Sequence, residues 1–505
     1  MQTLVDPLKR ALQIRPNAIA FIDGEREITF AEFDQRCGKL VSALRALGAE
    51  SGARVAILAN NSAQYFEAYV GIPAGGMVVV PLNTRHAMPE LVYALQDSGA
   101  NILITDRADV GELADAVEHV IMLPDAYETL LADVEPAELG EGVAETDLAG
   151  LFYTGGTTGA SKGVMLTHRN LIANAQHWLA SVPQNEHDRS LVMAPMFHAA
   201  GSNGILAAIW QGALQVPLGT FDPAAVLNLI EKHRINITLG VPSMLAAIAE
   251  EQHANPRDVS SLEVLIHGGS PIATEVVRRS CSAFPTTQLI EVYGATETSP
   301  LVALLGNEET LMDDPLARSC GRAVVGCSVS IKDADGSELP RGEVGEVVVC
   351  GTNIMKGYWN KPEQTAEVLK HGGYYTGDMG YLDEDGYLFL VDRSKDMIVS
   401  GGENVYSTEV EDVLYRHPAV LEAAVFGVPD DKWGEAVHAI VVPRPEGAQV
   451  DPTELIAFCR EHIGGYKVPK GIDIQREPLP KSGPGKVLKR ELRAPFWAGT
   501  DRAVN

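Results

Sequence analysis

The sequence is poor in positive charge and has no long apolar runs. Its 505 residues contain 40 lysines and arginines against 67 aspartates and glutamates, which gives a formal net charge of −27. Such a charge argues against partners made of nucleic acid and against anionic membrane surfaces. The N-terminus lacks a signal-peptide core, and no apolar run reaches the roughly 18 residues of a membrane-spanning helix. We therefore expect no integral membrane segment and a cytoplasmic protein.

Cysteine is also scarce. The six cysteines are scattered, without a Cys-x-x-Cys pair, at Cys37, Cys281, Cys320, Cys327, Cys350 and Cys459. This spacing argues against a structural zinc site, and it indicates free thiols in a reducing compartment. The length and a hydrophobic content of 46% allow two or more domains, each with its own core.

Glycine is concentrated in one stretch, residues 151–165. An apolar run at 148–153 precedes it and predicts a buried strand. The stretch then combines glycines, hydroxyl residues and one cation: Gly155, Gly156, Gly159, Gly163, Thr154, Thr157, Thr158, Ser161 and Lys162. Glycines let successive backbone N–H groups converge on an anion, and hydroxyls and a lysine add donors. The stretch therefore indicates polyphosphate binding, although its spacing is not that of a Walker P-loop and a plain surface loop is the alternative.

Helical and strand patterns alternate over most of the chain. Helices are expected at 29–47, 62–70, 90–98, 171–179 and 221–233, and strands at 53–58, 77–82, 102–105, 191–194, 235–241, 264–267 and 289–292. Such alternation predicts an α/β fold of parallel sheets covered by helices. The strands at 148–154, 191–194, 264–267 and 289–292 end in polar or glycine-rich loops. Ligand sites of parallel sheets lie at these strand ends, so the chemistry is expected there.

The pattern changes after about residue 320. Short strands at 329–332, 345–349 and 387–391 are separated by turn signals and predict an antiparallel, barrel-like subdomain. A charged connector follows, and the last hundred or so residues predict a small α+β domain. We place the large N-terminal domain at 1–393, a hinge at 394–396 and the C-terminal domain at 397–505.

Five segments, in order, resemble the motifs of the acyl-adenylate-forming (AMP-binding) superfamily, which includes acyl-CoA synthetases. They are the glycine-rich stretch 153–164, the segments 293–298 and 374–378, the connector and glycine loop at 392–404, and the tail at 480–492. The resemblance covers essentially the whole chain. It implies ATP, Mg²⁺ and coenzyme A as cofactors and a small carboxylic acid as substrate, with a C-terminal domain that acts as a mobile lid.

The resemblance also implies roles for residues of the N-terminal domain. It implies that the nucleotide phosphates contact Thr154, Gly155, Gly156, Thr157, Thr158 and Lys162. It also implies a catalytic role for Thr157. The adenosine lies against Gly268, Gly269, Ser270, Tyr293 and Gly294, and Thr296 contacts the α-phosphate. Glu297 holds Mg²⁺ against the phosphates. Asp378, placed at the end of a tight turn, accepts the ribose hydroxyls with the help of Arg393.

In the C-terminal domain, the resemblance makes Lys486 the mobile catalytic lysine. Negative charge builds up when a carboxylate attacks the α-phosphate, and a lysine that bridges the two groups stabilises it. Lys395 is the hinge residue, and Gly401 and Gly402 approach the pantetheine arm of coenzyme A. One departure is Ser407, where many relatives have proline; a serine still caps the following helix, so little consequence is expected.

The acid itself is less constrained. The segment 195–201 resembles the border of the acyl pocket, with His198 as its ring, and a hydrogen-bonded loop histidine is the alternative. Residues 195–204 contain no acidic residue or arginine, which counts against an amino acid or a dicarboxylate. Further wall candidates are Gly240, Val241, His267, Gly268 and Gly269, which suit an alkyl chain or an aromatic ring. A medium- or long-chain fatty acid and an aromatic acid both remain open.

The acceptor is also open. No insertion that would block coenzyme A is present between residues 374 and 411, so an acyl-CoA synthetase is the first choice. The alternatives are an adenylation enzyme that loads a carrier protein and a non-catalytic nucleotide-binding relative; an oxygenase of the luciferase kind is excluded only weakly. Retention of Glu297 and Lys486 counts against a non-catalytic role. A homodimer is one assembly that the sequence allows.

Overall fold

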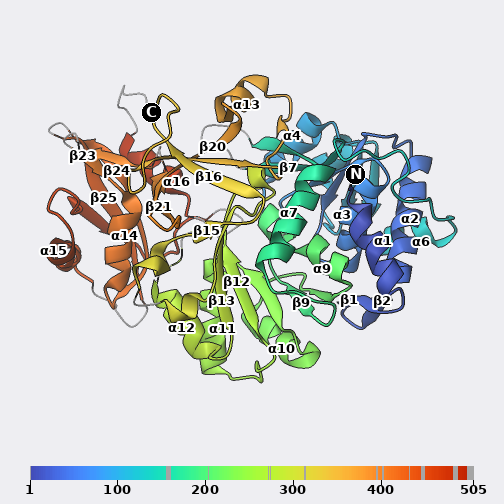
Figure 1. Cartoon of the computed structure of the whole chain (residues 1–505), viewed down its shortest axis with the longest axis horizontal. Helices are drawn as coiled ribbons and strands as arrows, with labels where there is room; N and C mark the ends of the chain where they lie inside the picture. The colour runs from blue at the N-terminus through green and yellow to red at the C-terminus, as the bar shows by residue number, and fades with distance from the viewer. Residues whose placement is uncertain are drawn as a thin grey trace.

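The computed structural model describes residues 2–154, 161–202, 204–270, 272, 274–311, 314–393, 396–400, 403–430, 433–444, 450–481 and 487–497. Figure 1 shows an elongated molecule with the N-terminal elements at one end and the elements after residue 396 at the other. Three sheets make up the part before residue 393, and a fourth belongs to the C-terminal part. None of the helices that the structure describes is long and apolar enough to cross a membrane.

The first sheet has seven strands in the order β18-β8-β7-β4-β3-β5-β6. Their bounds are Gly357–Tyr358, Lys162–Thr167, Leu148–Thr154, Val78–Pro81, Arg54–Leu58, Ile102–Thr105 and His119–Met122. Its neighbours are parallel except at β7–β8 and β8–β18. The helices of this region are α1 (Val5–Ile14), α2 (Phe30–Ala46), α3 (Ala63–Ala74), α4 (Met88–Ser98), α5 (Gly111–Asp115) and α6 (Asp125–Ala132).

The second sheet has nine strands in the order β15-β14-β13-β12-β11-β9-β10-β1-β2. Their bounds are Arg322–Ala323, Ala303–Leu305, Gln288–Tyr293, Val264–Gly268, Ile237–Gly240, Arg189–Val192, Leu214–Pro217, Ile19–Asp23 and Arg26–Thr29. The six strands from β13 to β1 are parallel. The predicted parallel α/β sheets are therefore present. The four strand ends that carry the expected chemistry divide between two sheets, because β7 belongs to the first sheet and β9, β12 and β13 to the second.

Helix α7 (His168–Ser181) and helix α9 (Ile205–Gln211) lie between these two sheets. Leu171 of α7 and Leu206 of α9 belong to the core of the first sheet, whereas Trp178 and Ala207 belong to that of the second. The outer face of the second sheet is covered by α10 (Pro223–His233), α11 (Pro242–Ala254) and α12 (Thr274–Ala283). The short helices α8 (Ala199–Ser202), η1 (Thr296–Thr298), η2 (Glu308–Thr310) and η3 (Pro315–Arg318) lie in loops.

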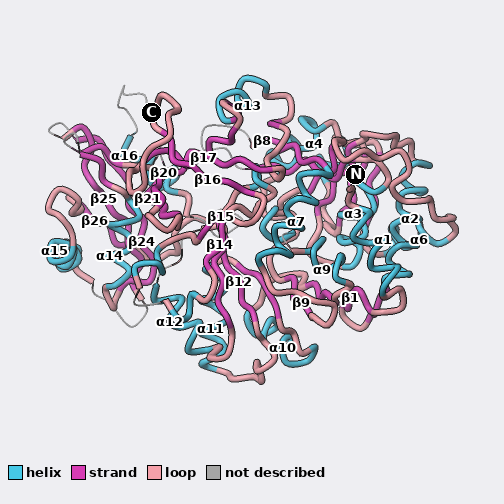
Figure 2. The backbone as a smooth tube through the Cα atoms, in the orientation of Figure 1, coloured by secondary structure: helices cyan, strands magenta, loops and turns pink. Residues whose placement is uncertain are grey.

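The third sheet is antiparallel, as the turn-separated strands predict. It consists of β16 (Cys327–Lys332), β17 (Gly345–Gly351), β19 (Leu369–Lys370), β20 (Gly373–Leu382) and β21 (Leu388–Arg393). Helix α13 (Pro362–Val368) precedes β19. Figure 2 shows this sheet between the C-terminal part and the two larger sheets.

The C-terminal part has a sheet and a core of its own. Its elements are β22 (Ile398–Ser400), β23 (Glu403–Val405), α14 (Ser407–Arg416), β24 (Val420–Asp430), β25 (Gly434–Pro443), α15 (Pro452–His462), β26 (Gly471–Ile474) and α16 (Lys489–Trp497). The apolar cluster around Val410, Val425, Val437 and Leu455 contains only residues from Ile398 onward. A separate core is the property that lets a domain fold and move as a unit.

A buried histidine joins the N-terminus to α7. His168 is fully buried, and its Nδ1 accepts the backbone N–H of Leu4 at 3.1 Å. Burial lowers the pKa of His168 from its ordinary 6.5 to about 4, so the folded protein holds this ring neutral. Because the unfolded chain binds the proton more readily, folding free energy is lost as the pH falls from 6.5 towards 4.

We predict that His168→Asn makes the protein less sensitive to acid. The asparagine keeps an acceptor for Leu4 and cannot titrate, so the stability difference between wild type and variant should shift by about 1.4 kcal/mol per pH unit below 6.5. Urea denaturation at several pH values measures it. The exposed His187, replaced in the same way, is the control. A stability difference that does not change with pH would show that His168 is not the group responsible.

Candidate active site

The two residues that flank the glycine-rich stretch face each other across a hairpin. Strands β7 and β8 are antiparallel, and Thr154 pairs with Lys162 in their register. The predicted phosphate contacts Gly155, Gly156, Thr157 and Thr158 lie outside the described residues, between these two anchors. The ammonium of Lys162 lies 4.9 Å from the ring centre of Tyr358, which is a cation–π distance. The hairpin thus places a positive charge beside the glycine-rich stretch.

The segment that carries Glu297 leaves the end of β13 in a tight loop. A Cβ on Gly294 would lie 1.5 Å from the carbonyl oxygen of Pro300, so only glycine fits there. The hydroxyl of Thr298 accepts the N–H of Ala295 at 3.0 Å. Together these contacts fold residues 294–300 back on themselves and turn Thr296 and Glu297 out of the end of the sheet.

Tyr358 holds the carboxylate of Glu297. Its hydroxyl donates to Oε1 of Glu297 at 2.9 Å, and this is the only hydrogen bond to that carboxylate that the described residues provide. Burial, with Glu297 close by, raises the pKa of Tyr358 far above its ordinary value. The phenol is therefore neutral and can only donate to the carboxylate.

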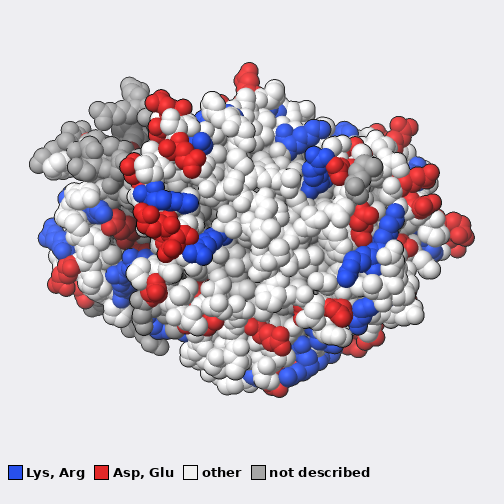
Figure 3. All heavy atoms as spheres, in the orientation of Figure 1, with Lys and Arg blue, Asp and Glu red and all other residues white. Residues whose placement is uncertain are grey.

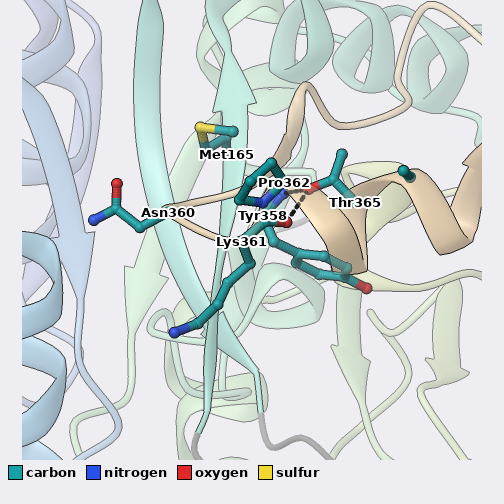
Figure 4. Close-up of a pocket in the computed structure, with 7 residues that line it drawn as sticks. Met165, Tyr358, Asn360, Lys361, Pro362 and Thr365 are labelled. Atoms are coloured by element: carbon teal, nitrogen blue, oxygen red, sulfur yellow. Dashed lines mark hydrogen bonds between the residues drawn. The ribbon is translucent and has the colours of Figure 1, made fainter.

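The backbone of Tyr358 is itself anchored. Its N–H donates to the hydroxyl of Thr365 at 2.9 Å, and the N–H of Trp359 donates to the carbonyl of Gly163 at 2.8 Å. Figure 4 shows Tyr358 and Thr365 at one side of a surface pocket of about 410 Å³ that Met165 and Pro362 also line. The pocket lies between β8 and α13, behind the side chain that holds Glu297.

Asp378 lies inside strand β20, and the expected tight turn is wrong. Gly377 has a positive φ of 75°, and the register of β20 with β17 shifts between Tyr375 and Met379, but the strand runs on from Gly373 to Leu382. Asp378 pairs in register with Arg393 on β21, so the two residues expected at the ribose are neighbours on adjacent strands. The hydroxyl of Tyr293 donates to Oδ2 of Asp378 at 2.7 Å.

Two carboxylates and three tyrosines therefore meet where the three sheets converge. Burial raises the pKa of Tyr293 and Tyr374 well above their ordinary values, and the charges of Asp378 and Glu297 add to the effect. No group of three metal-ligating side chains is found within the described ranges. A single carboxylate such as Glu297 suits Mg²⁺ that is bound mainly through nucleotide phosphates, because this ion keeps few protein ligands.

The large negative charge of the chain makes the position of its basic side chains important for a polyphosphate ligand. On the face in Figure 3, acidic and basic side chains are intermingled around the rim, and the centre is largely uncharged. Lys162 is the cation that the described structure brings to the phosphate segment.

His198 is half-buried and directly precedes α8. Its ring is 4.5 Å from that of Phe197, and its Nε2 is buried without a partner among the described residues. Burial, with the nearby charges of Arg85 and His86, lowers the pKa of His198 to about 3. The ring is therefore neutral, which suits a wall of an acid pocket.

His267 and Gly268, two of the predicted pocket-wall residues, are consecutive on β12 and therefore belong to opposite faces of the sheet. A Cβ on Gly268 would lie 2.3 Å from the carbonyl oxygen of Val292, and Gly269 has a φ of +82°, so both positions require glycine. His267 is not a wall residue. Its Nε2 contacts Oε2 of Glu308 at 2.6 Å with both side chains buried, on the sheet face opposite to Ile266. Burial lowers the pKa of His267, but Glu308 opposes it and the net pKa is raised.

The C-terminal predictions lie mostly outside the described residues. Gly401 and Gly402 fall between β22 and β23, which pair as a hairpin. Lys486 falls in a segment that the bridge between Lys481 and Val487 closes. Lys395 lies just beyond β21. The side chain of Arg393 is not described, although its backbone is part of β21.

Sequence reasoning missed the residues that support the Glu297 loop. Asn353 is fully buried, and its Nδ2 donates to the carbonyls of Thr298 at 2.7 Å and Leu301 at 3.0 Å. Oδ1 of Asn174 accepts the N–H of Leu301 at 2.9 Å. Neither asparagine belongs to a sequence motif, and Tyr358 was missed for the same reason.

This arrangement fits an adenylate-forming ligase: a large domain, with a hairpin that flanks the glycine-rich stretch and a loop that carries Glu297, is followed by a small domain. Family models agree. Residues 8–359 match the model described as AMP-binding enzyme, and residues 409–486 match that of the AMP-binding enzyme C-terminal domain. The chain belongs to the AMP-binding enzyme family. It is an enzyme, an acid–thiol ligase of the AMP-forming type.

Known relatives are similar over nearly their whole length. A feruloyl-CoA synthase from Amycolatopsis is 40% identical over 97% of this chain and 98% of its own. The fatty acid–[acyl-carrier-protein] ligase ScoC of Streptomyces coeruleorubidus is 34% identical over 100% and 98%. The medium/long-chain-fatty-acid–CoA ligase FadD8 of Mycobacterium tuberculosis is 34% identical over 98% and 90%.

Solved structures confirm the fold. The o-succinylbenzoate CoA synthetase MenE of Bacillus subtilis, in complex with its acyl-adenylate intermediate, has a TM-score of 0.87 at 31% identity, with 99% of each chain covered. ATP-bound MatB of Rhodopseudomonas palustris has a TM-score of 0.90 at 28% identity, again with 99% of each chain covered.

We predict that Gly294→Ala weakens nucleotide binding. The methyl group would collide with the carbonyl of Pro300 and force open the loop that carries Thr296 and Glu297. Calorimetric titration with Mg·ATP should show affinity reduced at least about tenfold, which corresponds to about 1.4 kcal/mol.

Gly306→Ala is the matched control. It lies close by in sequence, and the nearest atom to its added Cβ is 3.8 Å away, so ATP affinity should not change. If Gly294→Ala bound Mg·ATP as tightly as the wild type, the prediction would be wrong, because the loop could then accommodate the methyl group.

Proposed function

We propose that this ligase converts an aromatic carboxylic acid into its coenzyme A thioester. The observation that carries the proposal is the junction of Lys162, Tyr358 and Glu297 beside Tyr293 and Asp378. It provides a cation, a supported carboxylate and a tyrosine–aspartate pair where ATP is expected to bind. An aromatic acid is favoured because the feruloyl-CoA synthase has the higher identity, at 40% against 34% for both fatty-acid ligases.

In the first half-reaction, the carboxylate of the acid attacks the α-phosphate of ATP and pyrophosphate leaves. Thr154, Lys162 and the residues Gly155, Gly156, Thr157 and Thr158 hold the phosphates, and Thr296 contacts the α-phosphate. Asp378 and Arg393 hold the ribose, and Tyr293 lies against the adenine with Gly268, Gly269, Ser270 and Gly294. Glu297 would hold Mg²⁺, and that ion would supply neutralisation of the phosphate charge. Lys486 stabilises the charge that develops between carboxylate and phosphate.

In the second half-reaction, the thiol of coenzyme A displaces AMP from the acyl-adenylate. The pantetheine arm then passes Gly401 and Gly402. Since Lys486 and these glycines serve different steps, the C-terminal domain must reorient about Lys395. We place this hinge at 394–396, between domains at 1–393 and 397–505. The separate core that begins at Ile398 and the two family models, at 8–359 and 409–486, support this division.

Two further assignments complete the proposal. All six cysteines are free, which supports a cytoplasmic location. A homodimer stays a prediction from the sequence, and sedimentation equilibrium would test it.

A carrier protein is the second candidate acceptor, favoured by the identity to ScoC. Pyrophosphate release from Mg·ATP, measured with benzoates, cinnamates and fatty acids in the presence and absence of coenzyme A, separates the two acceptors. We expect turnover that depends on coenzyme A, with a thioester product and highest kcat/KM for an aromatic acid. Release without a thioester would favour a carrier protein, and a preference for fatty acids would overturn the aromatic assignment. No release with any acid would favour a non-catalytic relative.

We predict that Lys486→Ala slows adenylation on the order of 10²- to 10³-fold, because the variant loses one positive charge at the developing anion. Thiolysis of supplied acyl-AMP should change only a few-fold. Quenched single-turnover assays of each half-reaction measure the two rates. Lys470→Ala, at an exposed lysine of the same domain, is the control. Equal loss in both half-reactions would contradict the role given to Lys486.

A further inference from the structure

A small cavity lies between the nine-stranded sheet and the helices α7 and α9. Its floor consists of side chains from β9, β10, β11 and β12, and its cover consists of Trp178 from α7, Ile205 from α9 and the bare backbone of Gly201 and Gly204. The volume of the cavity is about 40 Å³. Since one water molecule occupies about 30 Å³ of liquid, the cavity has room for one small chemical group.

Two polar side chains, those of Ser190 and Gln215, lie side by side on the floor of the cavity and form a polar row. Ser190 on β9 pairs in register with Gln215 on β10 and with Ile237 on β11. Side chains that are in register on neighbouring strands point to the same face of a sheet, so these three side chains point together towards α7. A polar row in a core is costly unless its groups form hydrogen bonds.

Two atoms of this row lack a hydrogen-bond partner within the described structure. They are Oγ of Ser190 and Nε2 of Gln215, both buried, and the Gln215 residue is only 1% exposed. The other polar groups of the cavity are satisfied. Nε1 of Trp178 donates to Gln184 at 3.0 Å, and the hydroxyl of Thr238 donates to the carbonyl of Leu191 at 2.8 Å. One donor and one hydroxyl thus remain available to a group inside the cavity.

The cavity extends towards the expected position of the acid. Ala194 and Gly201 line it, and they flank the segment of His198, whose carbonyl accepts the N–H of Gly201 at 2.9 Å. Ser190 on β9 lines the same cavity four residues before Ala194. Apolar side chains of Val192, Leu239 and Ile266 line the way. The polar row and the residues that flank the His198 segment therefore line one and the same cavity.

We propose that this cavity binds the end of the acid that is remote from its carboxyl group, and that Gln215 and Ser190 select an acid with a hydroxyl at that end. Nε2 of Gln215 donates a hydrogen bond to the hydroxyl oxygen, and Oγ of Ser190 accepts a hydrogen bond from the hydroxyl O–H. This proposal rests on the proposed acid–CoA ligase function and names the chemical class of its acid. An acid without the hydroxyl leaves the donor and the acceptor buried and unpaired, so the site discriminates against it.

The test compares acids that differ only in the remote hydroxyl. The probes are para-hydroxycinnamate against cinnamate, and a medium-chain fatty acid with and without a terminal hydroxyl. The wild-type enzyme should show kcat/KM for the hydroxylated member of at least one pair higher on the order of 10- to 100-fold. Equal kcat/KM within both pairs would overturn the proposal and leave the ligase function intact, whereas no pyrophosphate release with any acid would refute the ligase function itself.

Variants then locate the preference. In Gln215→Leu the ratio of kcat/KM values within the preferred pair should fall towards one, and Ser190→Ala should reduce it independently. Gln176→Leu is the matched control, because Gln176 lies on the same helix as Trp178, does not line the cavity and donates to the side chain of Gln2 at 2.6 Å; its ratio should equal that of the wild type. A ratio that stays at the wild-type value in both cavity variants would overturn the assignment, as expected if the row held only an ordered water.

Folding is checked separately. Replacing an unpaired buried amide by leucine removes an unsatisfied group, so the thermal midpoint of Gln215→Leu should equal or exceed that of the wild type. A lowered midpoint would show that Gln215 serves the fold, and it would count against the proposal.

Discussion

The active site depends on a few buried amide side chains that join separate parts of the chain. The loop with Glu297 leaves the nine-stranded sheet, and its carbonyls at Thr298 and Leu301 bind Nδ2 of Asn353, which follows β17 of the third sheet. Asn170, on α7, donates to the carbonyls of Thr352 at 2.8 Å and Ile354 at 2.7 Å. Since buried carbonyl groups must be paired, these amides fix the relative positions of segments that no regular ladder connects.

The second constraint is charge. The site must receive a polyphosphate, yet Glu297 and Asp378 are acidic and the whole chain carries a net charge of −27. The tyrosines at positions 293 and 358 resolve part of this conflict, because each donates a neutral hydroxyl to one of the two carboxylates without adding charge. Lys162 then adds a local cation, and its position over the ring of Tyr358 links it to the same group. Local contacts must therefore offset the repulsion between the negatively charged protein and the nucleotide phosphates.

Sequence periodicity predicted the elements well, because amphipathic helices such as α2 and apolar strands such as β3 follow local patterns. It did not predict that β7 and β13 lie in different sheets, since strand pairing depends on contacts between distant segments. The tight turn predicted before Asp378 was wrong because a glycine such as Gly377 also occurs at irregularities inside strands. Tyr358, Asn353 and Gln215 carry no motif at all, and their roles exist only once the fold brings their partners together.

One face of α7 connects the nucleotide loop with the acid cavity. Asn170, Asn174 and Trp178 are spaced four residues apart, so they lie on one side of the helix. Asn170 and Asn174 hold the segments around Ile354 and Leu301, and Trp178 covers the cavity that contains Gln215 and Ser190. A single rigid helix thus sets the distance between the acid and the group that the acid must attack. Since a catalytic geometry tolerates displacements of much less than the width of an atom, one helix that serves both sites is a direct way to keep them aligned.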